Sequence, residues 1–288
     1  MPRIDGTTTF EVVHGGVRIA GDCAPSGVPL IMLHGLTAMR RYVVMGSRVL
    51  AHSGFRATSY DARGHGDSSP AADRSAYEYS DQIGDLEAVL DGLDLERAIL
   101  VGASMGAATA IGFALRHPMR VTALVLITPA ATGGAPAGAA LKSWDALADG
   151  LERGGIDGFL DAYDPPIDAR WRETVLRVTR QRLERHADLT AVADALRIVP
   201  RSSAFEGLAQ LEQIAARTLV VGSRDEPDPT HPLALAKSYV ERLPSAELIV
   251  EDPGKSPLAW QGAQLSRRIV DFLVRSGVPG AGHWAGAG

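Results

Sequence analysis

Several residue patterns that define protein classes are scarce or absent in this chain of 288 residues. A single cysteine, Cys23, excludes an intramolecular disulfide, and without His-x-x-x-His pairs or dense carboxylate clusters the sequence gives no support for a metal site. No apolar run approaches the roughly eighteen residues of a membrane-spanning helix. The 29 basic residues are outnumbered by 34 acidic ones and do not cluster, so neither nucleic acid nor a membrane is expected as a partner.

Cofactor and targeting signals are missing as well. The glycines at 102–106 do not form the Gly-x-Gly-x-x-Gly pattern that binds dinucleotides, so no organic cofactor is expected. The first residues do not form a charged and then apolar secretory signal, which predicts a cytoplasmic protein. We expect the partner to be a small molecule, and the sequence leaves the oligomeric state open.

Short apolar runs alternate with helical stretches along most of the chain. Such alternation predicts an α/β fold with a mostly parallel central sheet that helices cover on both faces. A hydrophobic content of 45% over this length is enough for one domain with a full core. Apolar spacing predicts helices at 42–52, 77–93 and 258–274, and strands at 9–13, 17–21, 30–33, 56–60, 98–101, 123–127, 218–221 and 247–250.

The pattern changes between the sixth and seventh expected strands. Residues 130–140 are rich in Gly and Ala, and residues 141–208 are charged and helix-like without a strand signal. We therefore expect a core of residues 1–129 and 209–288, with a helical cap of residues 130–208 over the carboxyl edge of the sheet, where open α/β sheets bind ligands. His186 lies among arginines and a glutamate in this segment, which favours a solvated helix face.

The clearest positive signal is the pentapeptide Gly102-Ala103-Ser104-Met105-Gly106. It follows the apolar stretch 98–101 and precedes a stretch of small, apolar residues, an order that predicts strand, sharp turn and helix. A serine held on such a turn projects its hydroxyl above the sheet edge, and glycine-sized neighbours let strand and helix approach closely. Ser104 is therefore the predicted nucleophile.

Two earlier motifs add to this one. His34-Gly35 follows the expected strand 30–33, and Asp61-Ala62-Arg63-Gly64-His65-Gly66-Asp67-Ser68 follows the expected strand 56–60. In type, order and spacing, the three motifs resemble those of the α/β-hydrolase superfamily, and the resemblance covers nearly the whole chain.

This resemblance implies the α/β-hydrolase fold and a nucleophile elbow at Ser104. It also implies an oxyanion hole made by the backbone N–H groups of Leu36 and Met105, which would hold the oxyanion formed when Ser104 attacks an acyl carbonyl. His34 and His65 belong to the motifs and are expected to be structural.

The acid of the triad in this superfamily usually follows the penultimate strand, where this chain has Gly222-Ser223-Arg224-Asp225. The resemblance therefore implies Asp225 as the carboxylate that orients the base. Glu226 and Asp228 are close enough in sequence to take the role instead, and a turn or helix-capping carboxylate is the structural alternative for Asp225.

The chain departs from the superfamily where the base is expected. The superfamily has a histidine in a Gly-His step after the last strand, whereas this chain has Gly254-Lys255. A lysine with an ordinary pKa of about 10.4 is protonated at neutral pH, so Lys255 is a base only if burial lowers its pKa, and an ion pair with Asp225 is the alternative. His231, in the loop after Asp225, is the predicted base because an imidazole pKa near 6.5 lets it take and return a proton.

The predicted function is a serine hydrolase that cleaves a carboxylic ester, lactone or thioester of a small molecule through an acyl-Ser104 intermediate. Two alternatives stay open. One is an inactive homologue that binds a small ligand, with Lys255 locking Asp225; the other is a non-hydrolytic acyl transfer, lyase or cyclisation reaction in the same pocket.

Overall fold

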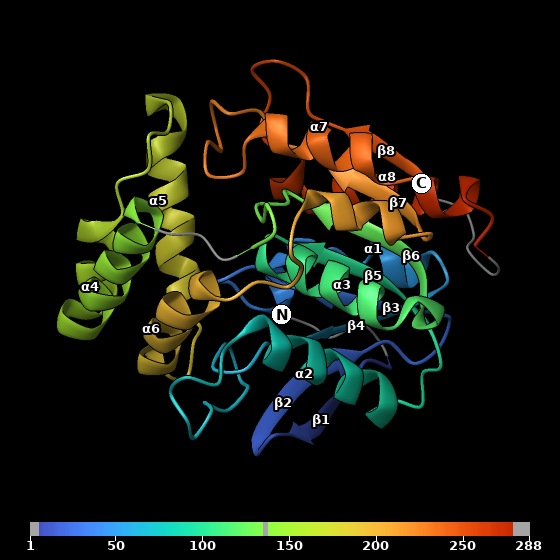
Figure 1. The fold of residues 1–288 in the computed structure, drawn as a ribbon, viewed down its shortest axis with the longest axis horizontal. Coiled ribbons are helices and arrows are strands. Elements are labelled where there is room, and N and C mark those ends of the chain that lie inside the picture. The colour runs from blue at the N-terminus through green and yellow to red at the C-terminus, as the bar shows by residue number, and fades with distance from the viewer. Residues whose placement is uncertain (1–5, 135–137, 279–288) are drawn as a thin grey trace.

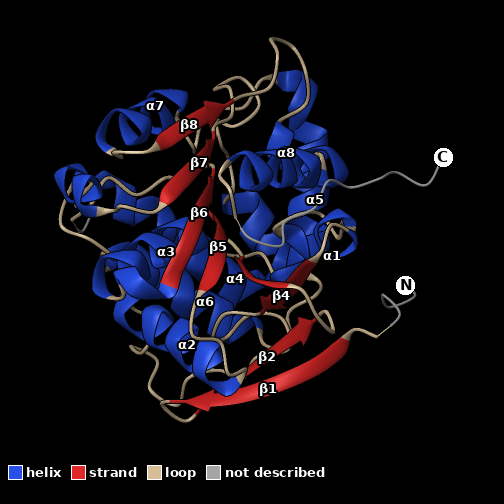
Figure 2. Ribbon diagram, turned by 90° about the vertical axis from the view of Figure 1, so that its right-hand side faces the viewer, coloured by secondary structure: helices blue, strands red, loops and turns tan. Residues whose placement is uncertain are grey.

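The computed structural model describes residues 6–134 and 138–278 of the chain. Eight strands form one sheet in the order β1-β2-β4-β3-β5-β6-β7-β8. β1 and β2 form an antiparallel hairpin at one edge, β2 pairs antiparallel with β4, and the other neighbours pair in parallel (Figure 2). The α/β fold with a mostly parallel sheet is thus confirmed. The strands are β1 (Thr8–His14), β2 (Val17–Cys23), β3 (Val28–Leu33), β4 (Phe55–Tyr60), β5 (Ala98–Ala103), β6 (Val121–Ile127), β7 (Arg217–Val221) and β8 (Ala246–Ile249).

Helices pack on both faces of this sheet (Figure 1). On one face, α2 (Tyr79–Gly92), α3 (Met105–Arg116) and α7 (Leu233–Arg242) share a buried cluster with alternate strand residues such as Leu100. On the other, α1 (Val49–His52) and α8 (Gly262–Arg275) pack on the intervening residues such as Ile99. Because successive strand side chains point to opposite faces, strands covered on both sides read as continuous apolar runs. Short 3-10 helices occupy Arg40–Tyr42, Pro118–Arg120, Val199–Arg201, Leu208–Gln213 and Leu258–Trp260.

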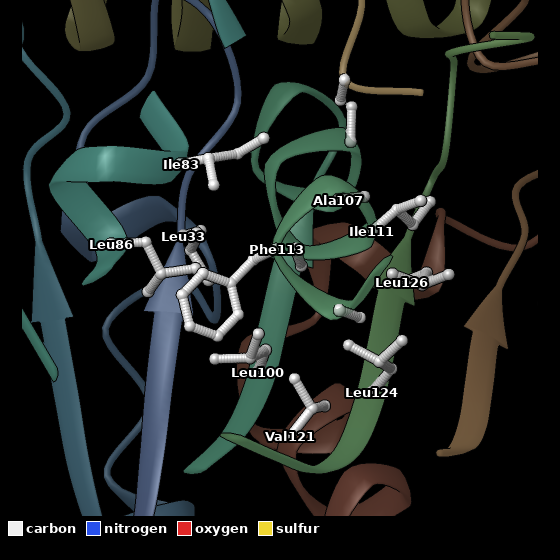
Figure 3. Packing of buried hydrophobic residues seen from close by; sticks show 14 of the residues in the cluster. Leu33, Ile83, Leu86, Leu100, Ala107, Ile111, Phe113, Val121, Leu124 and Leu126 are labelled. Carbon is white, nitrogen blue, oxygen red and sulfur yellow. The ribbon is translucent and has the colours of Figure 1, made fainter. Parts of the chain in front are cut away.

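The core beside β5 depends on a close approach of α2 and α3. Phe113 of α3 lies between α2 and the sheet, near Leu86 and Leu100 (Figure 3), and is fully buried. A Cβ on Gly112 would lie 2.5 Å from Ile83 Cδ1, so glycine allows this approach. Each large apolar side chain buried here stabilises the fold by roughly 1.5–3 kcal/mol, and the packing fixes α3, whose first residue follows Ser104.

In the described part of the chain, three α-helices lie between β6 and β7: α4 (Ala139–Ala162), α5 (Ala169–Leu183) and α6 (Leu189–Ile198). These helices and their connections, which we call the helical insertion, lie together at one side of the core (Figure 1) and bury a cluster of their own that includes Phe159, Leu183 and Leu196. α4 is kinked at Gly155, where φ is 60°. Among the described residues, no helix combines the length and apolar character that crossing a membrane requires.

The prediction of a helix at residues 42–52 is wrong over most of that range. Met45 and Gly46 both have positive φ, at 49° and 73°, which interrupts a right-handed helix, so α1 begins only at Val49.

Candidate active site

Ser104 sits on the turn that joins β5 to α3, with φ 50° and ψ −108°. This backbone conformation is strained for a residue with a side chain and is typical of functional turns. A Cβ on Gly102 would lie 2.3 Å from Gly106 O, and one on Gly106 would lie 2.3 Å from Leu33 O. Both glycines are therefore needed for strand and helix to meet, and the turn lifts the Ser104 hydroxyl to the carboxyl edge of the sheet.

A hydrogen-bonded chain of three side chains starts at this hydroxyl. Ser104 Oγ lies 3.0 Å from His231 Nε2, and His231 Nδ1 lies 2.8 Å from Asp228 Oδ1. The Thr230 hydroxyl also donates to Asp228 Oδ1, at 2.9 Å. An ionised carboxylate accepts the Nδ1–H, which leaves Nε2 as the acceptor for the serine proton. The structure thus brings Ser104 and His231 together as the sequence predicts.

Asp225 takes a different position from the one the resemblance implies. Its Oδ1 accepts the backbone N–H of Leu233 at 2.8 Å, the first residue of α7, and so caps that helix. The carboxylate hydrogen-bonded to His231 is Asp228, one of the alternatives that the sequence left open. The correction has a simple cause: Asp228 and His231 are three residues apart on one turn, with His231 N donating to Asp228 O at 3.2 Å.

The surroundings of Asp228 favour its ionised form. Burial alone raises the pKa of this carboxyl, but the charge of His231, hydrogen bonds from His231 and Thr230, and the positive charge of Arg182 together hold its pKa below the usual value. Asp228 is therefore ionised at neutral pH and able to stabilise the imidazolium that forms when His231 takes a proton.

Lys255 lies exposed on the loop after β8. Among the described residues it forms no ion pair, so the ion pair with Asp225, the alternative to a base role, is not present. In the same loop, Glu251 is buried and accepts the Arg224 N–H at 2.7 Å and the Leu258 N–H at 3.3 Å. The sequence analysis missed Glu251, which ties the end of β8 to the start of the loop that carries Asp228 and His231.

The two segments that carry the expected oxyanion donors lie beside the nucleophile. Gly35, which precedes Leu36, approaches the elbow so closely that a Cβ on it would lie 3.3 Å from Ser104 Cβ. Met105 is the first residue of α3, so its N–H is one of the helix-terminal groups without an intrahelical partner. In the described part of the chain, neither the Leu36 nor the Met105 N–H has a hydrogen-bond acceptor.

Ser104 opens onto a cavity of about 170 Å³ between the sheet edge and the helical insertion. Trp144 of α4, together with Val199 and Pro200, closes one side of it, while Leu36 and Met105 lie on the core side. None of the described residues that line the cavity carries a charge; they are Leu36, Tyr79, Ser104, Met105, Ala130, Ala131, Thr132, Gly134, Trp144, Val199, Pro200, Ser202 and Ser203. Within residues 6–134 and 138–278, no group of three His, Cys, Asp or Glu side chains could hold a metal ion.

Comparisons with known proteins agree with this architecture. A family model described as alpha/beta hydrolase fold matches residues 28–156. A 2-hydroxy-6-oxononadienedioate/2-hydroxy-6-oxononatrienedioate hydrolase 2 of Pseudomonas putida is 31% identical over 78% of this chain and 79% of its own length. A protein of Cupriavidus pinatubonensis with the corresponding name is 28% identical over 93% of this chain and 96% of its own. Some other curated relatives align over less than half of their length.

A solved structure of similar fold is the enol-lactonase from Burkholderia xenovorans LB400, with a TM-score of 0.75, 22% identity, and coverage of 92% of this chain and 100% of that one. The chain belongs to the α/β-hydrolase family. The relatives from Pseudomonas putida and Cupriavidus pinatubonensis are named as hydrolases, which supports a hydrolase activity of the general α/β type.

Proposed function

We propose that the protein is a serine hydrolase that cleaves a carboxylic ester, lactone or thioester of a small molecule through an acyl-Ser104 intermediate. The observation that carries this proposal is the chain from Ser104 Oγ to His231 Nε2 to Asp228, with distances of 3.0 and 2.8 Å, at the mouth of a cavity. An inactive binding protein would have no need for a strained serine whose hydroxyl meets an imidazole that a carboxylate orients.

In the first half of the reaction, His231 Nε2 takes the hydroxyl proton while Ser104 Oγ bonds to the acyl carbon. The carbonyl oxygen becomes an oxyanion, which the N–H groups of Leu36 and Met105 bind. His231 then gives its proton to the leaving alcohol, enol or thiol as the bond from the acyl carbon breaks. Asp228 remains ionised throughout and stabilises the imidazolium.

In the second half, water replaces the leaving group. His231 takes a proton from the water while its oxygen attacks the acyl carbon, and the same N–H groups bind the second oxyanion. His231 returns the proton to Ser104 Oγ, and the acid product leaves. No metal or organic cofactor is required for these steps.

The cavity supports a small, uncharged group beside the nucleophile. At about 170 Å³ and without charged lining side chains, it suits a short acyl or enol portion, with Trp144 and Val199 as apolar walls supplied by the helical insertion. The names of the relatives, an oxo-dienedioate hydrolase and an enol-lactonase, favour enol-type leaving groups or acyl compounds of small organic acids.

Fluorophosphonate labelling with intact-mass detection tests the proposal. We expect the wild type to gain one label, and Ser104→Ala, His231→Ala and Asp228→Ala to lose it, with folding checked by circular dichroism. Asp225→Ala, from the loop that also carries Asp228 and His231, and Lys255→Ala, from the loop after β8, serve as controls and should still be labelled. A folded wild-type protein that takes no label would contradict the proposal and favour a binding protein.

A further inference from the structure

The rings of three histidines from separate segments pack against one another in a row beside the turn that carries Leu36, and we call them the histidine row. His34 follows β3, His65 lies in the loop after β4, and His186 lies between α5 and α6 of the helical insertion. The ring centroids of His34 and His65 are 5.2 Å apart, and those of His65 and His186 are 5.4 Å apart. His186 is half-buried in this row, so the prediction that it lies on a solvated helix face is wrong.

The first of these rings holds the peptide group that contains the Leu36 N–H. His34 Nε2 accepts the Ala62 N–H at 2.9 Å, so the proton of the neutral ring lies on Nδ1 and is donated to Gly35 O at 2.8 Å. Ala38 N–H donates to the same oxygen at 3.0 Å. Because the Gly35 carbonyl and the Leu36 N–H belong to one planar unit and point in opposite directions, fixing the oxygen also aims the N–H.

His186 fixes the Thr37–Ala38 peptide group in the same manner. Its Nδ1 accepts the Gly66 N–H at 2.9 Å, so its Nε2 carries the proton and donates to Thr37 O at 3.0 Å. Ala187 N–H donates to Gly66 O at 3.1 Å beside it. The Thr37 carbonyl shares its plane with the Ala38 N–H, so the ring orients the donor that binds Gly35 O.

The turn requires support of this kind. Thr37 has a φ of 64°, in the left-handed region that β-branched residues avoid, and it is buried. Such a conformation persists only where neighbouring groups hold it. The hydrogen bonds form one series, from His186 to the Thr37–Ala38 peptide, to the Gly35–Leu36 peptide, and on to the Leu36 N–H. Successive hydrogen bonds in a chain polarise one another, which strengthens the last donor.

We propose that His186 is a positioning residue for the oxyanion hole: through two peptide groups in series it aims the Leu36 N–H, and it makes that aim depend on docking of the helical insertion. His34 fixes the nearer peptide group from the core side. The role of the Leu36 N–H in this inference rests on the proposed function. The hydrogen bonds by which His186 and His34 fix the turn are a property of the fold, and their effect can be measured without a substrate.

Two substitutions separate the two hydrogen bonds of His186. In His186→Asn, Oδ1 takes the place of Nδ1 and can accept the Gly66 N–H, but nothing reaches Thr37 O. In His186→Gln, Nε2 keeps the position that donates to Thr37 O. The control is Arg74→Ala, which removes a different docking contact of the insertion, the bonds from Arg74 to Asp194 and Glu152 at 2.9 Å.

Hydrogen–deuterium exchange provides the readout that needs no activity. We expect peptides covering residues 35–39 to exchange faster in His186→Asn and to stay near the wild-type rate in His186→Gln and Arg74→Ala. Equal exchange in His186→Asn and the wild type would overturn the inference even if Ser104 proved unreactive. Faster exchange at this turn in Arg74→Ala but not in His186→Asn would also overturn it, because docking of the insertion would then act without the hydrogen bond from His186.

Kinetics with 4-nitrophenyl acetate test the catalytic consequence. We expect His186→Asn to lower kcat by about 10- to 100-fold with little change in KM, less than the loss of a whole oxyanion donor, and to weaken binding of a boronic acid transition-state analogue by a similar factor. His186→Gln should keep most of the wild-type kcat and most of the affinity for the boronic acid. A KM effect alone, or equal losses in both variants, would reduce His186 to a structural contact.

Discussion

His231 Nδ1 lies 2.8 Å from Asp228 Oδ1, and the two residues are only three positions apart on the loop between β7 and α7. The proposed base and the carboxylate hydrogen-bonded to it thus come from one turn, while the loop after β8, where the superfamily has its histidine, carries the exposed Lys255. The order Ser104, Asp228, His231 along the chain is that of the family, but the histidine comes from an earlier loop than in the family pattern.

The two aspartates of this loop should behave differently when each is replaced by alanine. Asp228→Ala removes the group that fixes the His231 tautomer, so we expect the hydrolysis rate to fall about a thousandfold or more. Asp225→Ala removes a helix cap and should cost about 0.5–2 kcal/mol of unfolding free energy while keeping activity. Ester hydrolysis and urea unfolding of both variants check this. A larger rate loss for Asp225→Ala would return the catalytic role to that residue.

Replacement of Lys255 should have little effect. Its side chain is exposed and in no ion pair within the described residues, so Lys255→Ala should keep kcat/KM within about twofold and the unfolding free energy within about 0.5 kcal/mol. Steady-state kinetics and thermal unfolding are the measurements. A loss comparable to that of His231→Ala would show that the lysine acts as base.

Gly106→Ala should destabilise the protein. The added Cβ would meet the Leu33 carbonyl at 2.3 Å, and because that atom is backbone, β3 or α3 must move. We expect a loss of more than about 2 kcal/mol in urea unfolding. Gly154→Ala is the matched control, since its Cβ would meet nothing within 4 Å and alanine favours the helix. Similar losses for both variants would refute the close-packing argument.

The histidine row should make the free energy of unfolding depend on pH. Burial lowers the pKa of His34 and of His186 to about 4, from an ordinary value near 6.5. Arg40 lowers the pKa of His34 further. At His186, the hydrogen bond to Thr37 and the charge of Asp61 raise the pKa, while His34 and Arg182 lower it.

Since both rings are neutral in the folded protein, their contribution to the free energy of unfolding is fully present above about pH 6.5. Below that, the unfolded chain binds protons that the folded rings reject, so stability falls until the pH reaches about 4. The expected loss is on the order of 3 kcal/mol per histidine. Urea unfolding between pH 7.5 and 4.5 measures it, and His186→Asn should show a shallower slope than the wild type. Parallel slopes would contradict the assignment.

Much of this structure could be predicted because its signals are local. The elbow around Ser104 needs two glycines at fixed spacing, and strands such as β5 and β6 are buried on both faces and read as unbroken apolar runs. The mismatch at 42–52 has an equally local cause, the left-handed backbone at Met45 and Gly46, but a non-glycine residue such as Met45 gives no warning of it.

The site was harder to predict where its contacts are distant in sequence. Asp225 and Asp228 are the same residue type three positions apart, and only the path of the loop decides which faces His231 and which caps α7. His186 lies among charged residues in the sequence, a composition typical of a solvent-exposed helix face. Its hydrogen-bond partner Thr37, however, lies 149 residues away. Such pairings depend on how the helical insertion meets the core, which no short window of sequence contains.

The turn that carries both Asp228 and His231 also sets how the proposed machinery can deform. In a triad whose acid and base lie on separate loops, a movement of the loop that carries the base changes two distances at once. Here Asp228 and His231 lie on one turn, so a shift of that turn as a whole changes only the gap between His231 Nε2 and Ser104 Oγ. In the same loop, two residues before Asp228, Glu226 O accepts the Asp168 N–H of the insertion at 3.1 Å, so the insertion contacts the loop whose position sets this gap.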